Sequence, residues 1–435
     1  MDTRGYARWF RASTPYISAH RGRTFVVWLG GDALAHPNLP GIVHDLALLH
    51  VLGARVVLVH GARAQIDAAL PECRYHGNRR VTDQDSLTKV LGIYGQLRAS
   101  LEALFSTGLP TSPLHNADIA TVTGNFVTAR PIGVLDGVDH LYTGQVRGVH
   151  SGRIRAALES RALVLLSPIG YSPSGQAFNL ASDELAAEVA LALKADKLIM
   201  FDPHGYVRDA EGRNRANLTA AELDSLLDSP DTGNAETLRA MLRASRGGID
   251  RCHLVSFEED GALLMELFTA AGHGTQISEQ PHNVVRAARA EDVAGIVEII
   301  RPLEEAGVLV RRDRDRLEQE LGNFLVAELD GIVVGCCAVY PVEHSAELAC
   351  VAVHPSFRNS VQPGIGARLL AGAEQRAREL GVASLFLLTT QARDWFLEHG
   401  FEDSDPADLP APKRELYNYQ RNSKVMIKQL GHDDD

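Results

Sequence analysis

The sequence lacks the features that secreted and membrane-spanning proteins share. Its five cysteines are widely separated, with no CxxC pair and no metal-ligand spacing, which excludes a disulfide framework and a cysteine-based metal site. This use of cysteine favours a reducing compartment, so we expect a cytoplasmic protein without a bound metal. No stretch reaches the roughly 18 apolar residues of a membrane helix, and no apolar run follows the basic N-terminal residues. We therefore expect neither a membrane span nor a signal peptide.

Positive charge is scarce, and lysine is the scarcest cation. The 43 Lys and Arg residues are outnumbered by 55 Asp and Glu, which gives a net charge of −12. This balance argues against binding to nucleic acid or a membrane surface, because both need a basic face. The lysines are only six: Lys89, Lys194, Lys197, Lys413, Lys424 and Lys428. The 435 residues are otherwise of ordinary globular composition and suffice for two or three domains of about 150 residues.

Apolar runs alternate with helical patterns in the first 275 residues. Strands are expected at 25–29, 55–59, 162–166 and 197–201, and helices at 42–52 and 182–194. Such an alternation indicates a parallel α/β sheet covered on both faces. Before it, Trp9, Phe10 and Tyr16 at near-helical spacing predict an appended amphipathic helix.

A polar stretch at 276–283 separates two differently organised halves, so we expect one domain over 1–275, a linker over 276–285 and a second domain over 286–435. The second half is expected to hold strands at 284–288, 324–329, 333–340, 347–353 and 384–388, and helices at 290–300, at 366–380 and around Trp395. The strands 324–329 and 333–340 form a predicted hairpin around Asp330-Gly331.

The stretch from Cys350 to Leu370 carries the clearest chemical signal. A strand leads into a loop of small residues and then into a helix, whose unpaired N–H groups and dipole favour an anion. A turn such as Gly364-Ile-Gly366 also occurs where no ligand binds, so alone it leaves both interpretations open.

Together with Val353-His-Pro-Ser-Phe-Arg358 and Trp395-Phe-Leu-Glu-His-Gly-Phe401, this stretch resembles the Gcn5-related N-acetyltransferases (GNAT). The resemblance implies a mixed α/β domain that takes acetyl-CoA as co-substrate. The implied contacts are with Cys350, Val351, Val353, Gly364 and Gly366. Val361 departs from the family's Arg or Gln at the start of the glycine loop, which puts the details of pyrophosphate binding in doubt.

The resemblance narrows to the N-acetylglutamate synthases over residues 307–318, 347–355, 388–390 and 416–425. It implies acetyl transfer from acetyl-CoA to the α-amino group of L-glutamate, the first step of arginine biosynthesis. Glutamate brings two carboxylates, which the arginine fork binds well. The residues that match the glutamate-binding positions are Arg312, Arg421 and Ser423. The alternative is that either arginine lies on a solvated face.

Two further residues match the chemical steps in that family. Glu347 matches the general base, although an ordinary glutamate is a weak base for an ammonium and would need burial or a water relay. Thr389 matches the hydroxyl that assists thiolate departure, with simple strand packing as the alternative. A backbone N–H near Cys350 or Val351 would polarise the thioester carbonyl. Covalent catalysis by Cys350 is disfavoured, because a thiol on a buried strand is normally inert.

The first half resembles the amino-acid kinases, above all the acetylglutamate kinases, in residues 26–31, 57–66, 80–83 and 179–183. This implies a three-layer αβα sandwich. Trp28 stands where the kinases have a lysine, the turn His60-Gly-Ala-Arg63 carries side chains where backbone approaches phosphate, and no lysine lies between Lys197 and Lys413. Losing the two lysines of a working kinase would raise the activation barrier of phosphoryl transfer by several kcal/mol, at about 1.36 kcal/mol per tenfold in rate. We therefore expect no phosphoryl transfer. Asp183 is then structural.

Residues 253–258 and 266–275 resemble the arginine-binding segment of arginine-sensitive relatives. The resemblance implies L-arginine as a feedback inhibitor. The matching residues are Tyr16, His253, Glu266, Gly272 and Gly274. The alternative to an arginine site is that Gly272 and Gly274 only end a helix. Ala12 replaces a polar residue of some relatives, which leaves the strength of inhibition open. Relatives of this kind also imply a homo-oligomer, a hexamer by resemblance.

Two other functions remain open on the sequence alone. A bifunctional enzyme that keeps kinase activity is opposed by Trp28 and the missing lysines. A non-enzymatic arginine sensor is opposed by Glu347, Arg312 and Arg421. Consumption of ATP with acetylglutamate would indicate the first, and arginine binding without turnover would indicate the second.

Overall fold

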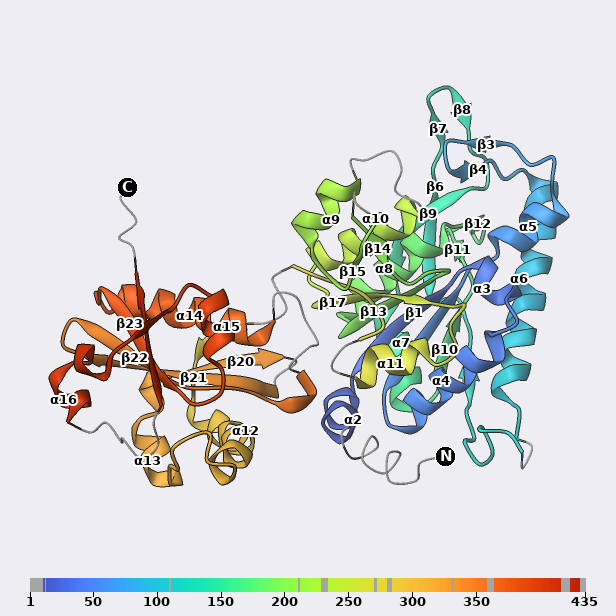
Figure 1. Cartoon of the computed structure of the whole chain (residues 1–435). Coiled ribbons are helices and arrows are strands. Elements are labelled where there is room, and N and C mark those ends of the chain that lie inside the picture. The colour runs from blue at the N-terminus through green and yellow to red at the C-terminus, as the bar shows by residue number, and fades with distance from the viewer. Residues whose placement is uncertain are drawn as a thin grey trace. The chain divides into compact units, whose positions relative to one another are not determined.

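The computed structural model (Figure 1) divides into two compact units, Met1–Pro281 and His282–Asp435. It describes residue 11 and residues 13–108, 111–209, 212–227, 234–269, 272–279, 284–329, 332–357, 364–415 and 423–430. No helix within these ranges is long and apolar enough to cross a bilayer.

The first unit is built on an eight-stranded sheet with helices on both faces (Figure 1). In spatial order its strands are β16 (Asn217–Thr219), β18 (Gly274–Ser278), β17 (Arg251–Ser256), β13 (Lys197–Asp202), β1 (Thr24–Leu29), β2 (Arg55–His60), β10 (Leu163–Leu166) and β5 (Thr121–Val122). All neighbours are parallel except β17 and β18. Helices α4 (Leu39–Val51) and α11 (Ala262–Phe268) contact each other and the sheet, as do α8 (Ser182–Leu193) and α10 (Ala235–Arg246). The predicted three-layer αβα sandwich is confirmed.

The central strands are apolar on both faces because helices cover both. Val26, Val57 and Leu198 on the sheet are fully buried in one core cluster with Leu185 and Val189 of α8. The chain winds from β1 to β2 and β10 in one direction and then returns to β13 and β17 on the other side of β1. In a sheet wound this way, ligands bind beyond the carboxyl ends of the strands where the order reverses.

Other elements of the first unit were not predicted from periodicity. A second sheet has the order β12 (Ala177–Asn179), β11 (Ile169–Tyr171), β6 (Val127–Pro131) and β9 (Gly144–Val149). Two-stranded ladders join β3 (Tyr75–His76) to β4 (Arg79–Arg80), β7 (Val134–Leu135) to β8 (Val138–Asp139) and β14 (Val207–Arg208) to β15 (Asn214–Arg215). The further helices are α2 (Thr14–His20), α3 (Gly31–Ala35), α5 (Arg63–Ala69), α6 (Gln84–Phe105), α7 (Ser151–Glu159) and α9 (Ala220–Leu227). Tyr16 lies on α2, whereas Trp9 and Phe10 lie outside the described residues.

The predicted linker at 276–285 overlaps a strand of each unit. β18 includes residues 276–278, and β19 (Val284–Ala287) begins at Val284. The polar composition that suggested a linker belongs partly to a buried strand, since Thr275 and Ser278 are buried. Thr275 is satisfied there because its hydroxyl donates to the carbonyl of Arg215 at 2.6 Å. The connection between the two strands is therefore shorter than predicted.

The second unit is a mixed α/β domain around a seven-stranded sheet. Its strands run in the order β19, β20 (Phe324–Leu329), β21 (Ile332–Val342), β22 (Ser345–Val353), β23 (Ser384–Thr389), β25 (Lys424–Gln429) and β24 (Glu402–Ser404). Its helices are α12 (Val293–Glu305), α13 (Arg314–Gln319), α14 (Ile365–Glu379), α15 (Arg393–Glu398) and α16 (Ala411–Arg414). Only β22 and β23 pair in parallel.

The sheet of the second unit opens between β22 and β23. The two strands pair only over residues 345–347 and 384–386, although both continue further. Past the paired part, Cys350 has a φ of +53°, and the register between β21 and β22 shifts. This is a β-bulge, which bends the strand and leaves one residue out of the ladder. Beyond Glu347 the facing edge of β22 therefore has no strand partner in β23.

Gly335 on β21 lets α14 approach the opened part of the sheet. A Cβ on this residue would lie 2.9 Å from Leu369 Cδ1 and 3.0 Å from Ile365 Cγ2, both on α14. A side chain here would push the first turn of α14 away from β21.

We expect Gly335→Val to lower the free energy of unfolding by about 1–3 kcal/mol, the usual cost of overpacking. Urea unfolding of the purified chain measures it. Gly322→Ala is the matched control, because nothing lies within 4 Å of a Cβ at Gly322. Equal stability of the two variants would contradict this account of Gly335.

Candidate active site

Glu347 lies where β22 and β23 separate. It pairs with Tyr340 on β21 and with Phe386 on β23, and Phe386 is the last β23 residue in that ladder. Its side chain is only 14% exposed, and its Oε2 lies 2.5 Å from Nζ of Lys413 on α16. A substrate amine that reaches this carboxylate must therefore compete with the Lys413 ammonium.

Arg312 follows α12 and belongs to the same region. Its backbone N–H donates to Glu304 Oε1 at 2.9 Å, and its Nη1 donates to the carbonyl of Val310 at 3.0 Å. Its Nε is buried without a hydrogen-bond partner in the described part of the chain. Arg312 thus keeps an unused donor, as a residue that binds a carboxylate ligand would.

Cys350 is a buried thiol at the bulge. Burial raises its pKa to about 11, and the opposing charge of Arg312 does not cancel this effect. A thiol with such a pKa is protonated near neutral pH, whereas a nucleophilic cysteine must be a thiolate. Burial therefore leaves the Cys350 thiol a packing group beside the candidate site.

Thr389 and Ser423 come together through β25. Thr389 pairs with Lys424, the residue after Ser423, and both hydroxyl-bearing residues are buried. The Thr389 hydroxyl accepts from the backbone N–H of Ala392 at 3.0 Å and so holds the turn before α15. A hydroxyl that accepts in this way still has its own O–H to donate. Arg421 lies outside the described residues.

The predicted acetyl-CoA residues flank the opening. Val351 and Val353 are partly exposed on β22 beyond Glu347, and Gly364 precedes the first turn of α14. A Cβ on Gly366 would lie 3.2 Å from the Trp395 ring, so a larger residue would crowd that turn. The free N–H groups of a helix start favour an anionic group such as pyrophosphate. Val361 and its loop lie outside the described residues.

The predicted arginine-site residues are also brought together, in the first unit. His253 Nδ1 lies 2.6 Å from Glu266 Oε1, and the backbone N–H of His273 donates to Glu266 Oε2 at 2.5 Å. A Cβ on Gly272 would lie 2.8 Å from Glu266 Oε2. The helix of Tyr16, α2, contacts α11, which carries Glu266.

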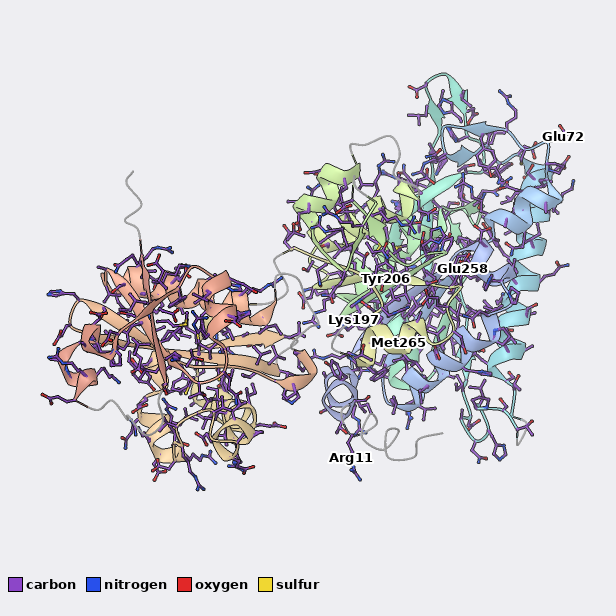
Figure 2. All side chains as sticks on the ribbon, in the orientation of Figure 1. Arg11, Glu72, Lys197, Tyr206, Glu258 and Met265 are labelled. Atoms are coloured by element: carbon purple, nitrogen blue, oxygen red, sulfur yellow. The ribbon has the colours of Figure 1, made fainter. Side chains whose placement is uncertain are left out.

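Lys197, which is labelled in Figure 2 and is buried in the first unit, completes this cluster. Its Nζ lies 3.2 Å from Nε2 of His253. Burial and the charge of Lys197 lower the pKa of His253, so the neutral ring accepts from lysine and donates through Nδ1 to Glu266. Although burial opposes it, hydrogen bonds from His253 and from the His273 backbone lower the pKa of Glu266. The result is a buried carboxylate balanced by one lysine.

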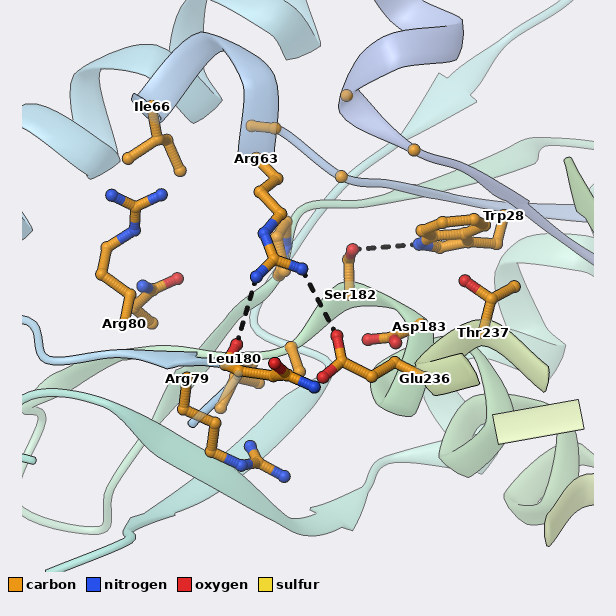
Figure 3. Close-up of a pocket in the computed structure, with 18 of the residues that line it drawn as sticks. Trp28, Arg63, Ile66, Arg79, Arg80, Leu180, Ser182, Asp183, Glu236 and Thr237 are labelled. Carbon is orange, nitrogen blue, oxygen red and sulfur yellow. Dashed lines mark hydrogen bonds and ion pairs between the residues drawn. The ribbon is translucent and has the colours of Figure 1, made fainter. Parts of the chain in front are cut away.

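The kinase-like crevice of the first unit persists as a cavity of about 410 Å³ (Figure 3). Trp28 lies in its wall and donates through Nε1 to Ser182 Oγ at 3.0 Å. None of the described residues that line it is a lysine. The described lining of the cavity therefore lacks the lysine that stabilises the transferred phosphoryl group in the kinases.

Comparison with known proteins agrees with this division. Residues 23–256 match the amino acid kinase family, and residues 320–403 match the acetyltransferase (GNAT) domain. An amino-acid acetyltransferase of Azotobacter vinelandii is 48% identical over 434 residues, which cover 98% of this chain and all of that protein. The chain belongs to the amino-acid acetyltransferase family.

Other members of the family agree over the whole length. The amino-acid acetyltransferase of Pseudomonas aeruginosa strain LESB58 is 46% identical over 98% of this chain and 99% of its own. The crystal structure of N-acetylglutamate synthase from Neisseria gonorrhoeae, complexed with coenzyme A and L-arginine, matches with a TM-score of 0.87 and 33% identity. That match covers 98% of this chain and all of the other. The same enzyme complexed with coenzyme A and N-acetyl-glutamate matches over the same shares with a TM-score of 0.63 and 34% identity.

Sequence reasoning missed Lys413 and Lys197 as members of these sites. Because the chain has only six lysines, each lysine is a stronger candidate for a specific role than in an average sequence. This scarcity can be read from the sequence. Their partners were not visible, because they lie 56 or more positions away along the chain. Within the described ranges, no group of three or more His, Cys, Asp or Glu side chains could hold a metal ion.

We expect Cys350→Ala to keep the turnover number within a few fold, because the protonated thiol takes no part in bond formation. Steady-state release of CoA measures this, and intact-protein mass spectrometry under acetyl-CoA should show no acetylated enzyme. Alanine keeps the buried, non-glycine backbone of the bulge, so the variant isolates the sulfur. Loss of turnover together with an acetylated wild-type protein would establish the covalent route instead.

Proposed function

We propose that the chain is an N-acetylglutamate synthase, which transfers the acetyl group of acetyl-CoA to the α-amino group of L-glutamate. The products are N-acetylglutamate and CoA, and the reaction is the first step of arginine biosynthesis. One observation carries the proposal: Glu347, the matching base, lies where the parallel strands part, in a chain that aligns with a synthase over 98% of its length.

The opened sheet suits a thioester. From residue 348 onward the free edge of β22 offers backbone groups to the amides of the pantetheine arm, as an extra strand would. A backbone N–H at the Cys350 bulge then polarises the thioester carbonyl and stabilises the oxyanion. Glu347 first takes a proton from the glutamate ammonium, and the neutral nitrogen then attacks the carbonyl carbon. As the carbon–sulfur bond breaks, Thr389 donates its proton to the departing thiolate. The nitrogen loses its second proton to solvent as the amide forms, and a proton from solvent restores the Thr389 hydroxyl.

Glutamate specificity is assigned to cations around the opening. Arg312 has a buried Nε without a hydrogen-bond partner in the described part of the chain. Arg421 and Ser423 are proposed to bind the two carboxylates of L-glutamate together with Arg312. Lys413 pairs with Glu347 before the substrate amine arrives. We propose that it positions this carboxylate and releases it to the amine.

Arginine is proposed to inhibit the enzyme at the cluster of Tyr16, His253, Glu266, Gly272 and Gly274. A cationic ligand needs a carboxylate and carbonyl oxygens, and Glu266 is held ionised by Lys197 and His253. Inhibition requires two states that arginine binds unequally. By family resemblance the protein is a cytoplasmic homo-oligomer, and a hexameric mass in light scattering would support that assembly.

The decisive assay mixes purified protein with acetyl-CoA and single amino acids and follows free thiol. Thiol release should be fastest with L-glutamate and should fall when L-arginine is added. Release that is no faster with glutamate than with other amino acids would remove the glutamate assignment. Consumption of ATP with N-acetylglutamate would revive the bifunctional alternative.

We expect Lys413→Met to lower kcat by about tenfold with a smaller change in the KM for acetyl-CoA, because Glu347 loses the partner that orients it. Lys413→Arg keeps the charge and should restore part of kcat. Lys428→Met is the control, since Lys428 pairs with Glu374 at 2.6 Å instead. Steady-state kinetics with both substrates varied test this. Equal losses in Lys413→Met and Lys428→Met would show a general effect of losing an ion pair.

We expect Glu266→Gln to raise the arginine concentration for half inhibition by about tenfold or more, because a charged hydrogen-bond partner is lost. Each variant is compared with its own uninhibited rate, so a change in basal rate does not confuse the result. Glu159→Gln, at an exposed position outside the arginine-binding segments, is the control. An unchanged inhibition curve in Glu266→Gln would place the arginine site elsewhere.

A further inference from the structure

Tyr340 is the strand neighbour of the candidate base. It pairs directly with Glu347 across β21 and β22, and residues opposite each other in an antiparallel ladder carry their side chains on the same face of the sheet. The Tyr340 ring is partly buried and packs against the core of the second unit. Neither the proposed proton transfer nor the proposed binding of glutamate uses this ring.

The ammonium of Lys413 contacts both of these residues. Its Nζ lies 2.5 Å from Glu347 Oε2 and, over the Tyr340 ring, 5.9 Å from the ring centre. A cation at this distance from an aromatic face is attracted by the negative face of the ring. Lys413 therefore has a second attractive partner besides the carboxylate.

The hydroxyl of Tyr340 is fixed by a charged acceptor. It donates to Glu320 Oε2 at 2.6 Å, and Glu320 Oε1 accepts from Arg316 Nε at 2.8 Å. Burial and the bond to Glu320 raise the pKa of Tyr340, so the hydroxyl keeps its proton. Although burial opposes it, hydrogen bonds from Tyr340 and Arg316 lower the pKa of Glu320. The bond therefore joins a neutral donor to a carboxylate, which makes it stronger than a bond between two neutral groups.

Glu320 is held in turn by the end of α13. It follows the last residue of this helix, and its backbone N–H donates to the carbonyl of Arg316 at 3.0 Å. Leu317 anchors α13 because its side chain is buried in the same core cluster against which Tyr340 packs. The aromatic ring is therefore fixed at its base by β21 and at its hydroxyl by α13.

Acetyl transfer to glutamate requires two cations to exchange at one carboxylate. The α-amino group of the substrate arrives at Glu347 largely as an ammonium near neutral pH. Two ammonium groups at one carboxylate repel each other, so Lys413 must withdraw from Glu347 as the substrate binds. The Tyr340 ring attracts the withdrawn ammonium through its face and carries no charge that would compete for the substrate amine.

We propose that Tyr340 is a positioning residue, which retains the Lys413 ammonium on its ring while the ammonium of L-glutamate occupies Glu347. Glu320 holds the ring in the orientation that this exchange needs. The inference rests on the proposed function, because it assigns the exchange to the binding of glutamate. Tyr340 takes part in no bond formation, and it acts on the substrate only through Lys413.

Steady-state kinetics in two backgrounds tests this exchange. We expect Tyr340→Leu to raise the KM for L-glutamate by about threefold to tenfold, with smaller changes in kcat and in the KM for acetyl-CoA, because the withdrawn Lys413 loses its ring. Tyr340→Phe keeps the ring and should restore most of the affinity. In the Lys413→Met background, Tyr340→Leu should not change the KM for L-glutamate, since no ammonium remains to be retained. An equal rise in both backgrounds would overturn the proposal.

Glu320→Ala tests the hydroxyl end of the ring. We expect a smaller rise in the KM for L-glutamate than in Tyr340→Leu, because the ring stays but loses its charged acceptor. Glu318→Ala is the matched control, since Glu318 pairs with Arg314 on the exposed side of α13. Equal effects of the two replacements would contradict the role of Glu320.

The contact between Lys413 and Tyr340 can also be observed without turnover. Because the chain has only six lysines, reductive methylation with carbon-13 formaldehyde gives few methyl signals in NMR spectra, and Lys413→Arg identifies the signal of Lys413. We expect this signal to lie upfield of those of the exposed Lys89 and Lys424, since its methyl groups lie over an aromatic face. The displacement should persist in Tyr340→Phe and vanish in Tyr340→Leu. A signal that Tyr340→Leu leaves unchanged would overturn the proposal.

The wild-type chain decides the question even if Tyr340→Leu does not fold. With saturating CoA and L-glutamate, the Lys413 signal should stay upfield, because the ammonium remains on the ring after it leaves Glu347. A signal that moves to the position of the exposed lysines would overturn the proposal. A wild-type chain without glutamate-dependent release of CoA would instead overturn the proposed function, and the methyl signal would still decide whether Tyr340 holds Lys413.

Discussion

The β-bulge at Cys350 is the constraint on which the candidate active site depends. A positive φ at a non-glycine residue costs energy, and the strand accepts it where Cys336, Ala338 and their neighbours bury the bulge in the core. The bulge bends β22, and β22 and β23 part after Glu347. This local distortion therefore lies next to the opening that is proposed to hold the thioester, and it carries the backbone N–H that is proposed to polarise the thioester carbonyl.

The two units show opposite uses of charge. In the second unit, cations lie next to the carboxylate that is proposed to act as base, with Lys413 on Glu347 and Arg312 nearby. In the first unit, the crevice of the kinase fold has an indole in place of a lysine and arginines on the other side. Among the described residues of the first unit, the one buried lysine is Lys197. It lies outside the crevice and is linked through His253 to Glu266 by hydrogen bonds. The fold was kept, whereas the charges that catalyse phosphoryl transfer were not.

Several elements could be predicted because the signal is local. The strands at 25–29, 55–59 and 197–201 each matched within one residue, since a strand buried on both faces is a continuous apolar run. The predicted linker at 276–285 contains the boundary between the two units, but its first residues belong to β18 and its last two to β19. The β18 end could not be recognised from composition, because this strand buries polar side chains such as that of Ser278. The sheet of β6, β9, β11 and β12 was missed because β11 and β12 have only three residues each, whereas β6 and β9 are largely exposed or half-buried and form no continuous apolar run.

The sequence by itself determined the two fold classes, the family, and the absence of lysine from the kinase positions, because these are properties of motifs and of composition. Only the tertiary structure decided which cations meet which carboxylates. Lys413 reaches Glu347 and the ring of Tyr340, and Lys197 reaches Glu266 through His253. Such contacts join residues far apart along the chain. They depend on how strands and helices pack, which no local periodicity specifies.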